Sequence, residues 1–117
     1  MTDEQALSVT ELFDLLGHPR RRAILLLVAL APDEGIRLRT VAEAVYAVEH
    51  NVSPTQAASR KVTNVRGNLT PSHLDALEDG GLIRVGPDDR LSVGPEFGFG
   101  LVMIAFAHLG VDDEVVE

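Results

Sequence analysis

Nine consecutive apolar residues, 23–31, stand between Pro19 and Pro32. A helix that is apolar on every side has to be buried on most of its surface. Proline is tolerated at the first position of a helix and cannot continue a helix past its end. The run therefore predicts a core helix over residues 19–31, and a chain of 117 residues has room for a single core of this kind.

Capping patterns and helical spacing predict further elements on both sides of the core helix. Thr40 with Glu43 matches a capping box, and Ser53 with Gln56 repeats the pattern. The expected elements are helices over residues 9–16 and 41–49, a short strand over 36–39, and a helix that begins at Pro54.

One proline falls inside a helical pattern. The apolar face that reaches Leu69 resumes at Leu74, after a step of five residues, and Pro71 lies in the gap. In an unbroken α-helix the proline ring would press on the carbonyl of Gly67 and remove one hydrogen bond. We therefore expect a kinked or interrupted helix pair that ends at the next two glycines, and in the interrupted case Thr70 is the cap of the second helix.

The last third of the chain begins with a hairpin pattern. Two short alternating runs flank the turn at residues 86–90, which predicts a β-hairpin. The almost wholly apolar segment 97–109 follows, and as a helix it spans about 20 Å, short of the roughly 30 Å of a bilayer core. The acidic N-terminus also lacks the positive charge of a secretory signal. We expect a cytoplasmic protein that does not enter the membrane.

This order of elements is that of a winged helix-turn-helix, in which one helix enters the DNA major groove and a hairpin flanks it. The segment LFDLLGHPRRRAIL, residues 12–25, resembles the opening of small haloarchaeal ArsR-like winged-helix proteins. The segment LTPSHLDALEDGGLI, residues 69–83, resembles their recognition helix and its exit into the wing. The resemblance implies a dimeric transcription regulator. Residues 48–57 look like an insertion, and the cysteine ligands of some ArsR-like metal sensors are missing.

We therefore predict a mainly α fold with a small β-hairpin wing. It consists of a winged helix-turn-helix domain over residues 1–96 and an apolar C-terminal dimerisation helix with an acidic tail over 97–117. The recognition helix is expected within residues 60–79 and the wing at 83–93.

The predicted partner is double-stranded DNA. Residues 54–86 hold four basic and three acidic groups, whereas the rest of the chain is acidic. Short polar side chains in this segment can donate hydrogen bonds to phosphates or base edges. The predicted DNA contacts are Arg60, Lys61, Arg66, Asn68, Thr70, Ser72 and His73 in the helix, and Arg84 and Arg90 in the wing. The alternative is a winged-helix module that binds another protein, which the acidic wing tip and the acidic residues of the recognition segment would suit.

The apolar segment 97–109 predicts a homodimer. If the core is complete by Val93, this helix still has an apolar surface to cover, and we expect a second subunit rather than its own core to cover most of it. Phe99, Met103 and Phe106 form a second stripe that can return to the core. The predicted interface residues are Phe97, Leu101, Val102, Ala105, Phe106, His108 and Leu109. Two-fold pairing would set two recognition helices one DNA turn apart.

The remaining polar residues suggest no chemistry. Arginines 20–22 occupy a helix N-terminus, where their charge opposes the macrodipole, so either DNA phosphates or carboxylates such as Glu11 and Asp14 should offset them. His108 and Asp112 could share a helix face, but two ligands do not make a metal site. We find no glycine-rich phosphate loop, nucleophile elbow or cysteine in the sequence, and we predict no catalytic residues, metal or cofactor.

Acidic residues outnumber basic ones by 18 to 10, and nine of the ten basic residues are arginine. At molar salt the Debye length shrinks to about 3 Å, which screens the repulsion between carboxylates. The charge therefore favours the protein of a halophile. The alternative is an acidic domain whose charge serves only solubility.

If the protein is halophilic, its unfolding midpoint rises between low and molar KCl, because salt screens the self-repulsion of a chain with a net charge of −8. Thermal unfolding in graded KCl measures this midpoint. A midpoint that stays constant would support the alternative.

Overall fold

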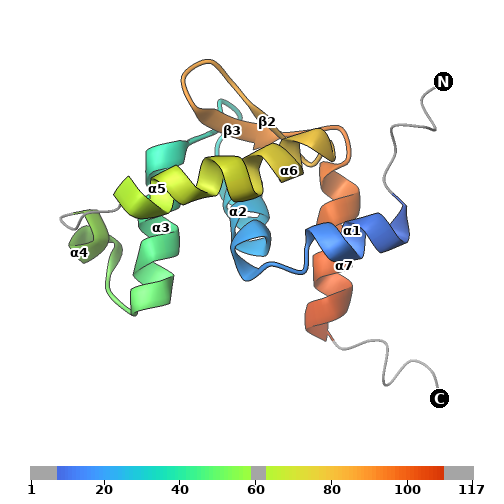
Figure 1. Ribbon diagram of the computed structural model, residues 1–117, viewed down its shortest axis with the longest axis horizontal. Coiled ribbons are helices and arrows are strands. Elements are labelled where there is room, and N and C mark those ends of the chain that lie inside the picture. Colours follow the sequence, from blue (N-terminus) through green and yellow to red (C-terminus); the bar gives the residue numbers. More distant parts are fainter. Residues whose placement is uncertain (1–7, 59–62, 110–117) are drawn as a thin grey trace.

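The computed structural model describes residues 8–58 and 63–109, with the backbone alone at residues 54, 58, 63, 64, 66 and 107–109. The described part is mainly helical with a small antiparallel sheet, an arrangement compatible with a winged-helix fold (Figure 1). In chain order the elements are α1 (Val9–Leu15), α2 (Pro19–Leu30), β1 (Ile36–Arg37), α3 (Leu38–His50), α4 (Pro54–Ala58), α5 (Thr63–Leu69), the π-helix η2 (Thr70–Leu74), α6 (Asp75–Asp79), β2 (Ile83–Val85), β3 (Arg90–Val93) and α7 (Phe97–Leu109).

Helix α2 is the predicted core helix, and it lies in the middle of the molecule (Figure 1). Ile24, Leu25 and Val28 are buried in a core cluster to which almost every other element contributes. The helix begins at Pro19, as its sequence predicts. The burial is not complete, because Leu30 in the last turn is 84% exposed.

The predicted hairpin forms, and β1 adds a third strand to it in the order β1-β3-β2. Leu91 of β3 pairs with Ile36 on one side and with Val85 on the other. The first strand is shorter than expected, because the buried Leu38 already begins α3 and its N–H donates to the carbonyl of Asp89 at 2.8 Å.

This early start overturns the capping box predicted at Thr40. Arg37 is the N-cap of α3 and makes no side-chain capping bond. Glu43 accepts a hydrogen bond from Arg39 at 3.0 Å instead of reaching back to a cap. The second predicted box is confirmed, since Ser53 and Gln56 bond each other's backbone N–H at the start of α4.

The chain passes Pro71 without a break in the helix. Leu69 has helical backbone angles, so the alternative in which Thr70 caps a new helix is wrong. Instead the N–H of Asp75 donates to the carbonyl of Thr70, five residues earlier, as in a π-turn. The π-turn accommodates a residue without an N–H and brings Leu69 and Leu74, five residues apart, into the same core. Together α5, η2 and α6 form one continuous helix, which we call helix 63–79.

Helix α7 completes the core, contrary to the expectation that the core is complete by Val93. Ile104 is 4% exposed and belongs to the core cluster. Phe99 and Phe106, which were expected to return to the core, are exposed instead, because the buried side of the helix runs through Gly100 and Ile104. Among the described residues, no helix is both long enough and apolar enough to cross a bilayer.

Two glycines of α7 allow a matched test of this packing. A Cβ atom on Gly100 would lie 3.0 Å from Cδ2 of Leu82, whereas nothing lies within 4 Å of a Cβ atom on Gly98. We expect Gly100→Val to lower the free energy of unfolding by about 1–3 kcal/mol through overpacking. Gly98→Val should lower it less, because a Cβ atom at this position meets no neighbour within the chain. Urea denaturation in molar KCl measures both, and equal stabilities would contradict the placement of α7.

Candidate nucleic-acid interface

Helix 63–79 lies across α2 and α3, and the hairpin follows it in the chain and packs beside α6 (Figure 1). The exposed surface of this helix has two halves of different chemistry. Asn68, Thr70 and Ser72 expose uncharged polar side chains in the first half. Asp75 and Asp79 expose carboxylates in the second. A polyanion is therefore compatible with the first half only.

The structure places the predicted DNA contacts in three groups. Arg60 and Lys61 lie outside the described residues, as does the side chain of Arg66. Asn68, Thr70 and Ser72 are exposed on helix 63–79, and Arg84 and Arg90 lie on the sheet. His73 is half-buried and faces the protein, since its Nδ1 atom accepts a hydrogen bond from Nε of Arg21 at 3.1 Å.

The outer face of the sheet carries three arginines, Arg37, Arg84 and Arg90, which we call the wing arginines. Ile36, Leu91 and Val85 are paired neighbours that face the core. Side chains alternate between the two faces of a strand, so the residues next to these three face outward. Arg37 and Arg84 are exposed and Arg90 is half-exposed.

Among the described residues, the wing arginines lie close together without forming an ion pair. Arg37 and Arg90 are direct cross-strand partners, and like charges in this position destabilise a sheet. Within residues 8–58 and 63–109, the ion pairs are Arg20 with Glu49 and Arg39 with Glu43, and neither includes a wing arginine. A bound anion would relieve this repulsion. The sequence prediction omitted Arg37, because only the pairing of β1 with β3 brings it beside Arg90.

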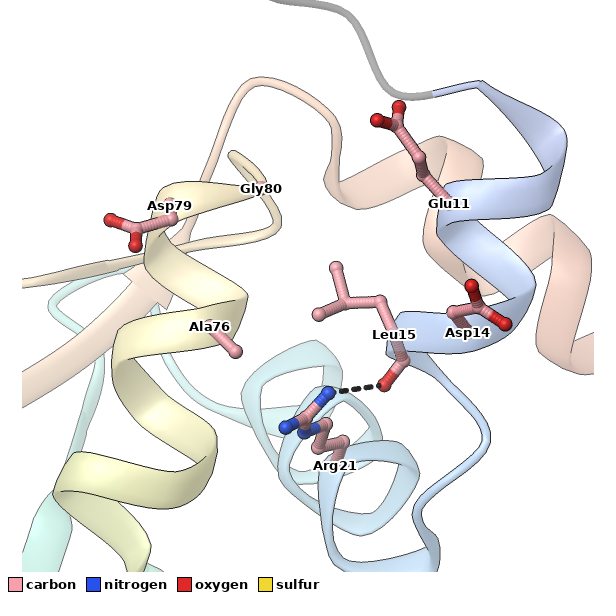
Figure 2. A pocket seen from close by; sticks show the side chains of 7 residues that line it. All are labelled: Glu11, Asp14, Leu15, Arg21, Ala76, Asp79 and Gly80. Atoms are coloured by element: carbon pink, nitrogen blue, oxygen red, sulfur yellow. Dashed lines mark hydrogen bonds between the residues drawn. The ribbon is translucent and has the colours of Figure 1, made fainter.

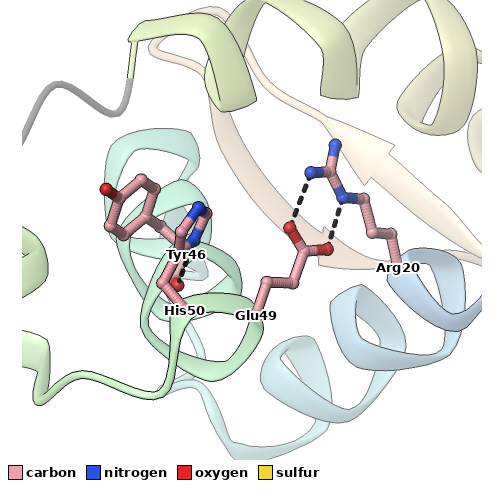
Figure 3. A network of polar contacts seen from close by, with 4 residues as sticks. All are labelled: Arg20, Tyr46, Glu49 and His50. Carbon is pink, nitrogen blue, oxygen red and sulfur yellow. Dashed lines mark hydrogen bonds and ion pairs between the residues drawn. The ribbon is translucent and has the colours of Figure 1, made fainter.

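The run of arginines at the start of α2 makes internal contacts. Arg20 binds both carboxylate oxygens of Glu49 on α3, at 2.6 and 2.7 Å (Figure 3). This bond lowers the pKa of Glu49 and raises that of Arg20. Next to it, His50 stacks on Tyr46 with ring centroids 3.9 Å apart. A carboxylate therefore offsets the charge of Arg20, as one of the two sequence-based alternatives proposed, but the partner is Glu49.

Arg21 and Arg22 bond carbonyl groups at the end of α1 and in the turn that follows. Arg21 donates from Nη1 to Leu15 and from Nη2 to Ser72, at 3.2 and 2.8 Å. Arg22 donates to the carbonyl of Leu16 at 2.6 Å. These bonds hold α1 and helix 63–79 against α2, so these two guanidinium groups serve the fold, as does that of Arg20.

A groove of about 380 Å³ separates α1 from α6 above Arg21 (Figure 2). Acidic residues of both helices border it, Glu11 and Asp14 on one side and Asp79 on the other. Glu11 also caps α1, where it exchanges hydrogen bonds with Ser8. The described residues contain no group of three side chains that could hold a metal ion. The acidic lining disfavours phosphate, so this groove does not belong to a nucleic-acid interface.

The outward side of α7 is apolar over all of its described length. Its exposed residues are Gly98, Phe99, Val102, Ala105 and Phe106. Of the predicted dimer contacts, Phe97 packs against the chain's own core and Leu101 is half-buried. The side chains of His108 and Leu109 lie outside the described residues. Helix α1 packs on α7 and also exposes apolar side chains, with Phe13 at 58% (Figure 1).

Comparison with known proteins places most of this structure in a family. Residues 13–92, from α1 to the end of the hairpin, match the sequence model of a family described as a domain of unknown function (DUF7344). No curated protein and no solved structure matches the chain.

Proposed function

The chain belongs to the DUF7344 family. From its charged and polar surfaces we propose that it is a cytoplasmic DNA-binding transcription regulator of a halophile. It binds double-stranded DNA as a homodimer. The first half of helix 63–79 enters the major groove, and the hairpin at residues 83–93 contacts the backbone.

The wing arginines are the observation that carries this proposal. In a chain of net charge −8, three guanidinium groups on one sheet face make no ion pair among the described residues. Arginine binds phosphate through two parallel hydrogen bonds, which gives geometric specificity as well as energy. Counterion release contributes little at molar salt, so a halophilic DNA-binding protein depends on a few well-placed contacts rather than on a basic surface.

The polar half of helix 63–79 supports base recognition. The amide of Asn68 and the hydroxyls of Thr70 and Ser72 are exposed, and these groups can donate to base edges and phosphates. His73 is not among the proposed contacts, because its ring faces Arg21. Glu78 is held by the backbone N–H of Val85, at 3.3 Å, at the junction of helix and wing.

The apolar side of α7 supports a dimer. A fully covered aromatic side chain buries about 150–250 Å². Scaled by the exposed fractions of Phe13, Phe99 and Phe106, and with two exposed valines added, the apolar area available for an interface is on the order of 400 Å² per protomer. A standard interface needs about 800 Å² per partner, of which somewhat more than half is apolar. A second copy presents the same surface, as two-fold symmetry requires.

A protein-binding module is the second candidate function. Asp75 and Asp79 on helix 63–79 and Asp88 at the wing tip are exposed carboxylates, which complement a basic protein surface and repel DNA.

DNA binding is tested with the full chain and genomic fragments from upstream of its own gene, by fluorescence anisotropy at molar KCl. We expect Arg37→Ala and Arg84→Ala to weaken DNA binding by the same factor for every DNA sequence. Each should also reduce the slope of the logarithm of the binding constant against the logarithm of the KCl concentration by about one. Asn68→Ala should relax specificity at one base pair, by about 1–3 kcal/mol.

Arg39→Ala is the matched control, since Arg39 is an exposed arginine already paired with Glu43. It should leave the affinity unchanged. If the folded protein binds no fragment, the protein-binding module replaces this proposal.

The dimer is tested by light scattering at molar KCl. Val102→Glu should yield a folded monomer, because Val102 is 50% exposed and a buried interface does not accept an unpaired carboxylate. Leu30→Glu adds the same charge to an exposed apolar site of α2 and should stay dimeric. Deleting α7 is not a suitable test, since Ile104 belongs to the core. A wild-type monomer at micromolar concentration would contradict the dimer.

A further inference from the structure

Arg21 and His73 are bonded to each other, and neither residue is among the proposed DNA contacts. Nε of Arg21 donates to Nδ1 of His73 at 3.1 Å, and Nη2 donates to the neighbouring carbonyl of Ser72 at 2.8 Å. One guanidinium group of α2 thus binds a side chain and a backbone group of η2. Since η2 is the middle of helix 63–79, this contact helps to set the position of the whole helix.

The donor and acceptor assignment fixes the protonation state of the ring. An arginine in a protein stays protonated, so its Nε–H acts as donor and never as acceptor. Nδ1 of His73 must then carry a lone pair, and the ring is neutral with its proton on Nε2. A proton on Nδ1 would turn the acceptor into a donor that faces another donor.

The charges around His73 also oppose its protonation. Burial lowers the pKa of His73 most, and Arg21, His18 and Arg20 lower it further. The His18 ring lies 5.6 Å away between centroids, at the N-cap of α2. Glu49 of α3 acts in the opposite direction, but it is bound to Arg20 through both of its oxygens. Asp14 lines the groove on the other side of Arg21.

We propose that Arg21 and His73 form a proton-sensitive latch, which holds helix 63–79 against α2 while His73 is neutral and loosens when His73 binds a proton. The latch itself does not require DNA. That it regulates DNA reading, by loosening the helix that carries Asn68, Thr70 and Ser72, rests on the proposed function.

The π-turn makes this part of helix 63–79 sensitive to the latch. Pro71 lacks an N–H, and the N–H of Asp75 is already bonded to Thr70, so the backbone here has an irregular hydrogen-bond pattern. The bond from Arg21 to the carbonyl of Ser72 supports this stretch from outside. Leu74 and Leu77 belong to the core through apolar contacts that do not depend on His73, so we expect protonation to loosen η2 without unfolding the domain.

The direction of the pH dependence follows from the lowered pKa. The unfolded chain binds a proton at His73 near its ordinary pKa of 6.5, whereas the folded chain binds it only at a lower pH. The stability that neutral His73 contributes is therefore fully present above pH 6.5 and is lost as the pH falls through the folded-state pKa.

The test is NMR of the full chain in molar KCl, with imidazole titration and amide hydrogen exchange. His73 should titrate below 6.5. Between about pH 7.5 and pH 5, amide protection over residues 72–77 should fall by roughly tenfold for each pKa unit of the shift, after correction for intrinsic exchange.

Two variants separate the latch from general acid sensitivity. His73→Asn keeps an acceptor oxygen near the position of Nδ1 and cannot titrate, so it should abolish this pH dependence. His50→Asn replaces an exposed histidine of α3 and should preserve it. Titration of His73 at or above 6.5, or an unchanged pH dependence in His73→Asn, would overturn the latch.

Fluorescence anisotropy with DNA on the same samples tests the proposed function separately. If the NMR results support the latch but the protein binds no DNA, the proposed function is wrong and the latch stands.

Discussion

The burial of α2 is the constraint on which the rest of the structure depends. Because this helix is apolar over most of its circumference, it needs neighbours on nearly every side, and α3, α7, η2 and β3 all pack on it. The side at Leu25 is covered by α7, whose Gly100 allows the helix to come close to Leu25 and Leu82. The C-terminal helix is therefore a part of the core that also exposes an apolar surface.

The arginines at the start of α2 connect this helix to its neighbours. Three guanidinium groups lie at the end of the helix where the macrodipole disfavours cations. Each is satisfied by an acceptor from another element: Glu49 for Arg20, Ser72 and Leu15 for Arg21, and Leu16 for Arg22. These bonds connect α1, α3 and helix 63–79 to the core helix. The charges that look in the sequence like a phosphate site thereby position the helix that we propose reads DNA.

Among the described residues, a cationic surface lies elsewhere, on the sheet. Arg37, Arg84 and Arg90 share its outward face, while the groove beside Arg21 is bordered by acidic residues. This separation gives an acidic protein a local surface suited to phosphate. The proposed DNA contacts do not include Arg21 or His73, so the proposed latch can change the position of the helix independently of the charge on the wing.

Local patterns in the sequence determined most of the elements. The apolar run between two prolines predicted α2, and the alternating runs around a turn predicted the hairpin. The five-residue step at Pro71 predicted a kink or an interruption, and the structure has a π-turn there. Each of these signals arises from residues close together in the chain, where backbone geometry and side-chain spacing decide the outcome. The tertiary structure alone decided that β1 pairs with β3, that Leu38 rather than Val41 begins α3, that Arg21 contacts His73, and which side of α7 is buried. These features depend on contacts between residues far apart in sequence, and the free energy of burying a side chain against a distant partner exceeds that of a local cap.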